Sequence, residues 1–230
     1  MKTAGIIGGL GPETTAEFYM EINFTCQQVS PKNRPPLLIW NVPLVYQIEH
    51  DLLTKNTGQE RYIPFLVEAA KRLEKGGADF LVMPCNSLHI FIKEIRNAVQ
   101  IPVLSVVEET ATFLASKKIS EVGLLGTSTT VSQNLYEPAL AKHSIAQRLP
   151  DGFAQAKIGK IISNLVLSRH NNADREELTQ IIANFSETGV KTIILACTDL
   201  QLLMPNHDDV EIFDTMKILA DATVREIVTK

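Results

Sequence analysis

Short apolar runs alternate with longer amphipathic stretches along the whole chain. Apolar runs of this length are typical of buried strands, and the stretches between them carry apolar side chains at helical spacing. The alternation predicts βαβ units with mainly parallel sheets. Strands are expected at residues 4–7, 37–40, 103–107, 121–126, 145–149 and 210–213 and in the runs before Cys85 and Cys197, and helices at 12–28, 62–75, 87–99, 108–117, 131–142, 151–168, 174–188 and 215–228.

Two of the apolar runs are built alike and lie 112 positions apart. Gly77 opens one run, which ends at Cys85, and Gly189 opens the other, which ends at Cys197. A helical pattern precedes each glycine at the same offset. Each half of the chain therefore predicts a helix, a tight turn, a buried strand and a cysteine at the strand end.

The duplication predicts an α/β fold with two pseudo-symmetric doubly wound lobes and an active-site cleft between them. We expect residues 1–100 with about 207–230 to form the first lobe and residues 101–206 to form the second. The last helix is thus expected to return to the first lobe. Residues 44–60 have a looser pattern and are expected to form a loop with a short helix.

The loops that follow the strands are where chemistry is expected. Ligands of open α/β sheets bind outside the carboxyl ends of the strands. Residues 8–11, 85–87, 126–128 and 197–198 all lie at such ends. A cysteine between a strand and a helix also lies near the positive end of the helix, which favours the thiolate.

A facing pair of such thiols is suited to racemisation. One thiolate removes a proton from a carbon acid, and the other thiol returns a proton to the opposite face. The amides after each cysteine, with the Asn86 and Thr198 side chains, would hold the substrate carboxylate and stabilise the developing charge.

Other interpretations of these residues remain open. A cysteine at a strand end is often a packed apolar side chain. Residues 8–11 do not follow the G-x-G-x-x-G spacing of a dinucleotide site. His89 either tunes Cys85 or serves as a capping or packing residue, since Gln201 takes its place in the second half. No C-x-x-C or H-x-x-x-H spacing supports a zinc site.

The composition argues against a nucleic-acid-binding protein and against a membrane protein. The chain has 230 residues, a formal net charge of −4 and three cysteines, and its pI is about 5.8. An acidic chain is a poor candidate for binding nucleic acid, and no apolar run approaches the length of a membrane span. We expect a cytoplasmic protein with free thiols and no membrane partner, because no secretory signal is recognisable.

Three segments together resemble the aspartate racemases of the Asp/Glu/hydantoin racemase superfamily. They are residues 4–12 (AGIIGGLGP), 83–89 (MPCNSLH) and 196–199 (ACTD). The resemblance runs the full length and implies a cofactor-independent amino-acid racemase, usually a homodimer. It implies that Cys85 and Cys197 are the two catalytic bases, with Cys197 acting on the L-enantiomer and Cys85 on the D-enantiomer.

The resemblance also bears on substrate choice. Lys157 matches a family lysine that binds the side-chain carboxylate of the substrate. The family often carries a second carboxylate-binding residue, an arginine, in the loop after the second strand, but here no arginine or lysine occurs between Asn41 and Lys55. This contact with the substrate carboxylate is then either missing or supplied by another residue, such as Gln47 or His50, and glutamate becomes a plausible substrate beside aspartate.

The sequence thus predicts racemisation of aspartate, glutamate or both, without a cofactor or metal. The expected substrate-binding residues are Leu10, Asn86, Ser87, Thr127, Lys157 and Thr198. Alternatives are an isomerase or decarboxylase of another small dicarboxylate such as maleate, and a dicarboxylate-binding protein without turnover.

Overall fold

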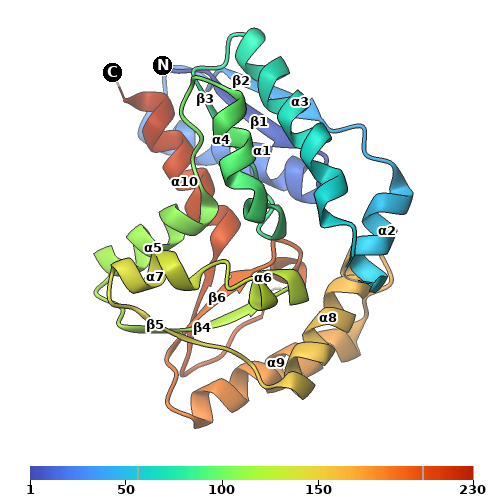
Figure 1. Cartoon of the computed structure of the whole chain (residues 1–230). Helices are drawn as coiled ribbons and strands as arrows, with labels where there is room; N and C mark the ends of the chain where they lie inside the picture. The colour runs from blue at the N-terminus through green and yellow to red at the C-terminus, as the bar shows by residue number, and fades with distance from the viewer. Residues whose placement is uncertain (56, 204, 230) are drawn as a thin grey trace. The chain divides into compact units, whose positions relative to one another are not determined.

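The structure is a computed structural model that describes residues 1–55, 57–203 and 205–229 (Figure 1). The chain forms two compact units. Unit 1 contains Met1–Glu109 and Met216–Lys230, and unit 2 contains Thr110–Thr215. The expected α/β class with parallel sheets is confirmed in both units.

Unit 1 is built on a parallel three-stranded sheet in the order β2-β1-β3. The central strand β1 pairs with both neighbours, with Ile6 opposite Ile39 on one side and Val82 on the other. The elements are β1 (Ala4–Gly8), α1 (Pro12–Val29), β2 (Leu37–Asn41), α2 (Tyr46–Lys55), η1 (Gln59–Tyr62), α3 (Ile63–Lys75), β3 (Phe80–Val82), η2 (Ser87–Phe91), α4 (Ile92–Ala98), α5 (Val106–Ser116, which runs on into unit 2) and α10 (Thr215–Val228).

Both faces of β1 and β3 are covered, which explains why these strands are apolar throughout, whereas the edge strand β2 is only partly buried. Ile7 and Leu81 belong to a core with Leu66, Ala70 and Ile95 of α3 and α4. Successive strand residues point to opposite faces, so Ile6 and Phe80 face the other side. All of these side chains are buried.

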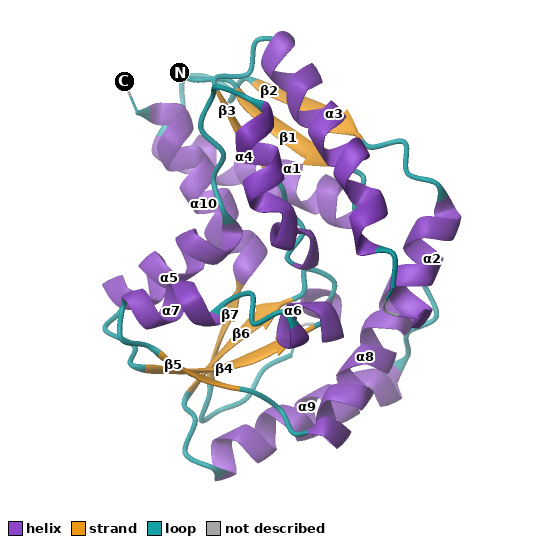
Figure 2. Ribbon diagram, viewed as in Figure 1, coloured by secondary structure: helices purple, strands orange, loops and turns teal. Residues whose placement is uncertain are grey.

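Unit 2 is built on a parallel four-stranded sheet in the order β5-β4-β6-β7 (Figure 2). Its core on one face joins Leu125, Ile193 and Leu195 of the sheet to apolar residues of α8 and α9. The elements are β4 (Glu121–Gly126), α6 (Ser128–Ser132), α7 (Glu137–Lys142), β5 (Ala146–Arg148), α8 (Gly152–Val166), α9 (Asn172–Glu187), β6 (Thr192–Ala196), η3 (Leu200–Leu203) and β7 (Glu211–Asp214).

The duplicated turn has the same geometry in both units. Gly77 and Gly189 have φ angles of 95° and 91°, in the region that glycine adopts at little cost. The amide after each glycine bonds back to the helix, from Ala78 to Leu73 and from Val190 to Phe185. These bonds have the 6→1 pattern of a Schellman helix end. The glycines therefore end each helix and direct the chain into the cysteine strand.

The strand order is duplicated as well. In each sheet the first strand is central, the second is at its side, and the cysteine strand lies on the other side. Beyond the cysteine strand, unit 2 has β7, with Ile193 opposite Ile212. In the described part of unit 1 an isolated bridge between Leu81 and Val103 takes that place. The two sheets are thus two copies of one arrangement.

The prediction of a strand at residues 103–107 is wrong, because only Val103 takes part in a β-bridge among the described residues. The carbonyl of Val103 accepts hydrogen bonds from the Arg96 guanidinium instead of a strand, and α5 begins at Val106. Ser105 caps this helix, because its Oγ accepts a hydrogen bond from the Glu108 amide at 3.4 Å. A serine three residues before a glutamate is a helix-start signal.

Other helices differ from their predicted form. The single helix predicted at 131–142 is two helices, α6 and α7, separated by Asn134 with a φ angle of 48°. Pro138 lies in the first turn of α7, where proline is tolerated. Residues 44–60 contain α2 and the start of η1, apart from Asn56, which lies outside the described residues.

The last helix belongs to unit 1. Lys2 donates its amide hydrogen to the Ile227 carbonyl at 2.9 Å, and Arg225 bonds to Glu109 at 3.0 Å. The chain passes from unit 1 to unit 2 after residue 109 and returns to unit 1 after residue 215. The sequence predicts these transitions near residues 101 and 207. The exact domain boundaries stay a prediction. No helix among the described residues is both long and apolar enough to cross a bilayer.

Candidate active site

The loops after β1 and β3 lie side by side at one edge of the unit 1 sheet. Because Ile6 pairs with Val82, the chain beyond Gly8 and the chain beyond Met83 leave the sheet together. Thr15 holds the first loop, since its Oγ1 accepts from the Gly9 amide and donates to the Gly11 carbonyl, both at 2.9 Å. Leu10 lies in this loop and packs partly against the unit core.

Cys85 sits at the end of the second loop with a partly exposed thiol-bearing side chain. Its amide donates to the Met83 carbonyl at 2.9 Å. Asn86 is buried at 2% exposure, and Ser87 begins η2. The structure therefore brings Leu10, Cys85, Asn86 and Ser87 to one edge of the sheet.

His89 links the Cys85 loop to α5. Its Nε2 accepts a hydrogen bond from the Val106 amide at 3.1 Å, so its Nδ1 carries the proton and donates to the Cys85 carbonyl at 2.7 Å. Burial lowers the pKa of His89 to about 4. A neutral imidazole with both nitrogens bonded to backbone positions Cys85 rather than exchanging protons with it.

Tyr62 is a second buried neighbour of Cys85 that the sequence did not single out. It lies in η1 and is 3% exposed. Burial raises the pKa of Tyr62 well above its ordinary value, and negative charge on Cys85 raises it further. Tyr62 therefore stays a neutral phenol beside the thiol.

The corresponding edge of unit 2 carries the second set of predicted residues. Gly126 pairs with Ala196, so Thr127 and Cys197 are the first residues beyond two paired strand ends. Thr127 caps α6 by accepting from the Thr130 amide at 3.2 Å. Cys197 and Thr198 are both buried at 5% exposure.

Asp199 is a neighbour of Cys197 for which sequence reasoning proposed no role. The Cys197 thiol donates to the Asp199 Oδ2 with a sulfur–oxygen distance of 3.6 Å. The spacing in the sequence could have indicated this contact, because a residue two positions after a cysteine at a strand end can turn back toward that cysteine. This carboxylate fixes the direction in which the thiol proton points.

Lys157 is not aimed at the edge that holds Cys197. Its ammonium bonds to Glu177 on α9 at 2.5 Å and lies 4.4 Å from the centre of the Phe153 ring. Gln155, on the other side of the same helix, faces the edge instead, because its Nε2 donates to the Gly126 carbonyl at 3.0 Å.

Gln155 was also missed by sequence reasoning. Its Oε1 is buried and finds no donor among the residues that the structure describes. A buried amide oxygen without a donor is costly, and here it lies where α8 meets the end of β4. No local pattern marks this residue, because its partner lies 29 positions earlier in the chain.

The loop and helix over residues 41–55, which lack the expected arginine, contain the carboxylate of Asp51. Asp51 accepts hydrogen bonds from Gln47 at 3.0 Å, Lys55 at 2.9 Å and Arg61 at 2.8 Å. The three donors, Arg61 first, hold the pKa of Asp51 well below its usual range. An arginine therefore reaches this segment from η1, beyond the stretch in which sequence reasoning looked for one.

Within the described residues, no group of three or more His, Cys, Asp or Glu side chains is arranged to hold a metal ion. Apart from the Asp199 carboxylate and the His89 imidazole, the polar side chains described at the two sheet edges carry hydroxyls, amides and thiols. These groups donate hydrogen bonds, which suits them to a carboxylate ligand.

Comparison with known proteins gives consistent matches. The family model described as Asp/Glu/Hydantoin racemase matches residues 7–223. The broad specificity amino-acid racemase RacX of Bacillus subtilis (strain 168) is 28% identical over 229 residues, which are 96% of each chain.

Two solved structures share the fold. The structure of an aspartate racemase homologue from Pyrococcus horikoshii OT3 has a TM-score of 0.80 and 25% identity, with 100% of both chains covered. The Picrophilus torridus aspartate racemase has a TM-score of 0.81 and 24% identity, with 100% of this chain and 96% of that chain covered.

Proposed function

Because the chain belongs to the Asp/Glu/hydantoin racemase family and is an amino-acid racemase, we propose that it racemises acidic amino acids with two thiols and no cofactor. Cys85 and Cys197 are the two bases in this proposal. The observation that supports it is the duplicated strand order, in which a cysteine without a disulfide bond follows the same strand of each sheet, Cys85 after β3 and Cys197 after β6.

The proposed reaction moves one proton off the α-carbon and another onto it. The Cys197 thiolate takes the α-proton of the L-enantiomer, and the Cys85 thiol delivers a proton to the opposite face. The roles reverse for the D-enantiomer. The transient negative charge spreads onto the α-carboxylate, where Asn86, Ser87, Thr127 and Thr198 donate hydrogen bonds. Leu10 supplies an apolar wall, and Asp199 orients the Cys197 thiol.

The proposal is tested by following the α-proton. The purified protein is incubated with L-aspartate, and separately with L-glutamate, in D2O without added pyridoxal phosphate. We expect loss of the α-proton NMR signal together with loss of optical activity. Ligand-induced stabilisation without exchange, from a protein whose thiols are shown to be reduced, would contradict a racemase of acidic amino acids and favour binding without turnover.

The Lys157–Glu177 pair sets the proposed recognition of the substrate side chain. Both side chains are about a third exposed, and exposed ion pairs contribute about 1 kcal/mol or less. Glu177 therefore holds Lys157 weakly enough for the flexible lysine side chain to leave Glu177, turn toward the strand end and bind a substrate carboxylate instead. A substrate with a neutral side chain has no such contact to gain, so Lys157 would favour acidic amino acids.

Changing this pair is expected to alter the KM for aspartate in opposite directions. Lys157→Met removes the cation and raises the KM for aspartate about tenfold, the cost of a lost hydrogen bond to a charged group. Glu177→Gln removes the competing carboxylate and lowers the KM by up to about fivefold. Steady-state kinetics with aspartate and alanine measure both effects.

Lys160→Met is the matched control, because Lys160 lies on the same helix and is exposed. It should leave the KM for aspartate unchanged. Equal changes in the KM for aspartate and alanine in the Lys157→Met protein would show that Lys157 does not recognise the side-chain carboxylate.

The proposed cytoplasmic location of the enzyme follows from the need to keep its thiols reduced. None of the three cysteines forms a disulfide bond, and proton transfer by Cys85 and Cys197 requires both thiols to remain reduced, as thiols are in a cytoplasm. The proposed active form is a homodimer. Isomerisation or decarboxylation of another dicarboxylate is not favoured, because the relative and the family model are both described as racemases.

A further inference from the structure

Asn41 is the last residue of β2 and lies at the same edge of the unit 1 sheet as the Cys85 loop. It pairs with Gly8 at the end of β1, and it is exposed. Ligands of open α/β sheets bind outside the carboxyl ends of the strands, and the loops after β1 and β3 already belong to the candidate site. The third strand of this sheet therefore adds the amide of Asn41 to the same edge.

Neighbours on both sides hold the backbone of Asn41 in place. Trp40 and Val42 both belong to the core that the sheet forms with α3 and α4. The Val42 amide donates a hydrogen bond to the Gly8 carbonyl at 2.9 Å. Because successive residues of an extended chain point to opposite sides, the Asn41 side chain points away from this core.

The Asn41 side chain rests on the loop after β1. A Cβ atom on Gly9 would lie 2.6 Å from the Asn41 Oδ1 and 3.0 Å from the Val42 nitrogen, so a side chain there would displace the Asn41 amide. Gly9 also has a φ angle of 82°, in the region that glycine adopts at little cost. Its amide donates to Thr15. The Asn41 amide therefore lies against a loop that is itself held in place.

The position of Asn41 relative to Cys85 suits a small dicarboxylate. Continuing the register between β1 and β3 by two residues brings Gly8 level with Pro84, the residue before Cys85. Asn41 is then two strand spacings, about 10 Å, from Pro84. A substrate whose α-carbon lies at the Cys85 thiol would extend its side chain along this edge toward Asn41.

We propose that Asn41 binds the side-chain carboxylate of an acidic substrate. Its amide nitrogen carries two hydrogens that a carboxylate oxygen accepts. The inference rests on the proposed function, which supplies the acidic amino acid, and it assigns a residue of unit 1 to the end of the substrate remote from the reacting carbon. Lys157 supplies a cation for the same carboxylate in the proposed function, and a carboxylate has lone pairs enough to accept from both.

Asn41→Asp keeps the size of the side chain and replaces the amide donor by a carboxylate, which repels the substrate carboxylate. We expect the KM for L-aspartate to rise at least about tenfold, as for the loss of a hydrogen bond to a charged group. The kcat should stay nearly unchanged, because the contact is the same in the ground state and in the transition state. The KM for alanine, which has no side-chain carboxylate, should not change. An equal rise in KM for both substrates would overturn the assignment.

Succinate binding tests Asn41 without turnover. Succinate has both carboxylates of aspartate but no amino group, so it cannot be racemised. Isothermal titration calorimetry should give a dissociation constant for succinate at least about tenfold higher for the Asn41→Asp protein than for the wild type. A wild type that does not bind succinate, or an Asn41→Asp protein that binds it equally well, contradicts the proposal. Absence of α-proton exchange in the wild type contradicts the proposed function instead, whatever the calorimetry shows.

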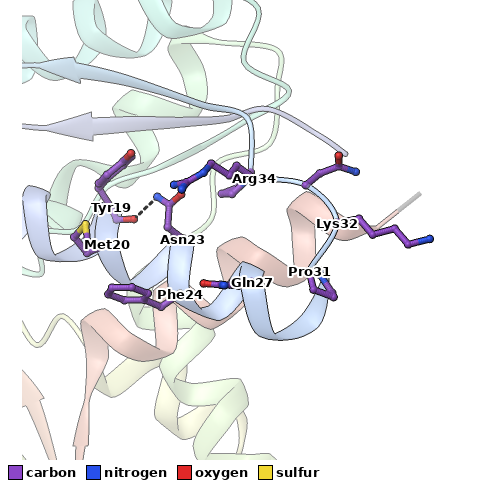
Figure 3. Close-up of a pocket in the computed structure, with 10 residues that line it drawn as sticks. Tyr19, Met20, Asn23, Phe24, Gln27, Pro31, Lys32 and Arg34 are labelled. Carbon is purple, nitrogen blue, oxygen red and sulfur yellow. Dashed lines mark hydrogen bonds between the residues drawn. The ribbon is translucent and has the colours of Figure 1, made fainter.

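Asn33→Asp is the matched control, because it makes the same change of charge in the same unit. Asn33 is exposed and lies in the loop before β2, at the opposite end of the strand that Asn41 ends. Figure 3 shows its neighbours Lys32 and Arg34 in the loop that follows α1. The control should leave the KM for aspartate and the dissociation constant for succinate unchanged. Circular dichroism and the unfolding midpoint check that each variant is folded.

Discussion

Replacing Cys85 or Cys197 by serine is expected to reduce racemisation of aspartate and glutamate by about 10²–10⁴-fold, the usual contribution of a general acid or base. A serine hydroxyl has nearly the volume of the thiol but is a far weaker acid, so the variant keeps its fold and loses one proton-transfer group. The change is measured by the rate of loss of optical activity, starting from each enantiomer in turn.

The two variants are expected to differ in what they still do. The Cys85→Ser protein retains the base that acts on the L-enantiomer, so it should exchange the α-proton of the L-form with D2O without inverting it. The Cys197→Ser protein should do the same with the D-form. Opposite preferences of this kind would identify which thiol serves which face.

Cys26→Ala is the control for this pair. Cys26 is buried in α1, and burial raises the pKa of its thiol, which makes it a packing residue. Its replacement should leave turnover unchanged. Near-wild-type racemisation by either the Cys85→Ser or the Cys197→Ser protein would rule out the mechanism with two thiol bases.

The second large effect concerns the pH dependence of stability. Burial lowers the pKa of His89 to about 4, whereas a histidine in an unfolded chain titrates near 6.5. Between these values the unfolded chain binds a proton that the folded chain does not. The stabilisation is therefore complete above about pH 6.5 and is lost as the pH falls toward about 4. The full loss is about 3 kcal/mol.

Urea unfolding at pH 7 and at pH 4.5 measures this effect. The His89→Leu protein should be less stable at pH 7, because the Val106 amide and the Cys85 carbonyl lose their partner. It should also lose less stability than the wild type on acidification, by about 2–3 kcal/mol. Arg96 and Glu108, the charged residues that act on His89, are present in both proteins.

His143→Leu tests whether the effect is specific to the buried histidine, since His143 is exposed. Its replacement should leave the difference between pH 7 and pH 4.5 as it is in the wild type. If the wild type and the His89→Leu protein lost equal stability between the two pH values, burial of His89 would not contribute.

The features that the sequence predicted well are those with local signals. Gly77 and Gly189 end their helices with the expected turn because a left-handed residue after an amphipathic helix is a signal within a few positions. The two cysteines were correctly expected beyond strand ends, because each follows a short apolar run, which is also a local signal. The strand predicted at 103–107 failed where two local signals competed, and the helix start at Ser105 prevailed over the apolar run.

The features that the sequence did not predict depend on partners far along the chain. The role of His89 follows from the amide of Val106, 17 residues later. The bond between Lys157 and Glu177, 20 residues later, was not predicted either. Such contacts arise when helices and loops pack together, and the spacing of apolar residues along the sequence does not predict them. The positions of the two cysteines were therefore easier to predict than the partners of His89 and Lys157.

The return of α10 to unit 1 has a consequence for how the chain is made. Residues emerge from the ribosome in order, and domains tend to fold as they are completed. All of unit 2 has been synthesised once Thr215 has been added, but unit 1 still lacks the helix whose Ile227 carbonyl bonds to the Lys2 amide. Residues 110–215 can therefore fold first, while residues 1–109 wait for residues 216–230 to complete unit 1.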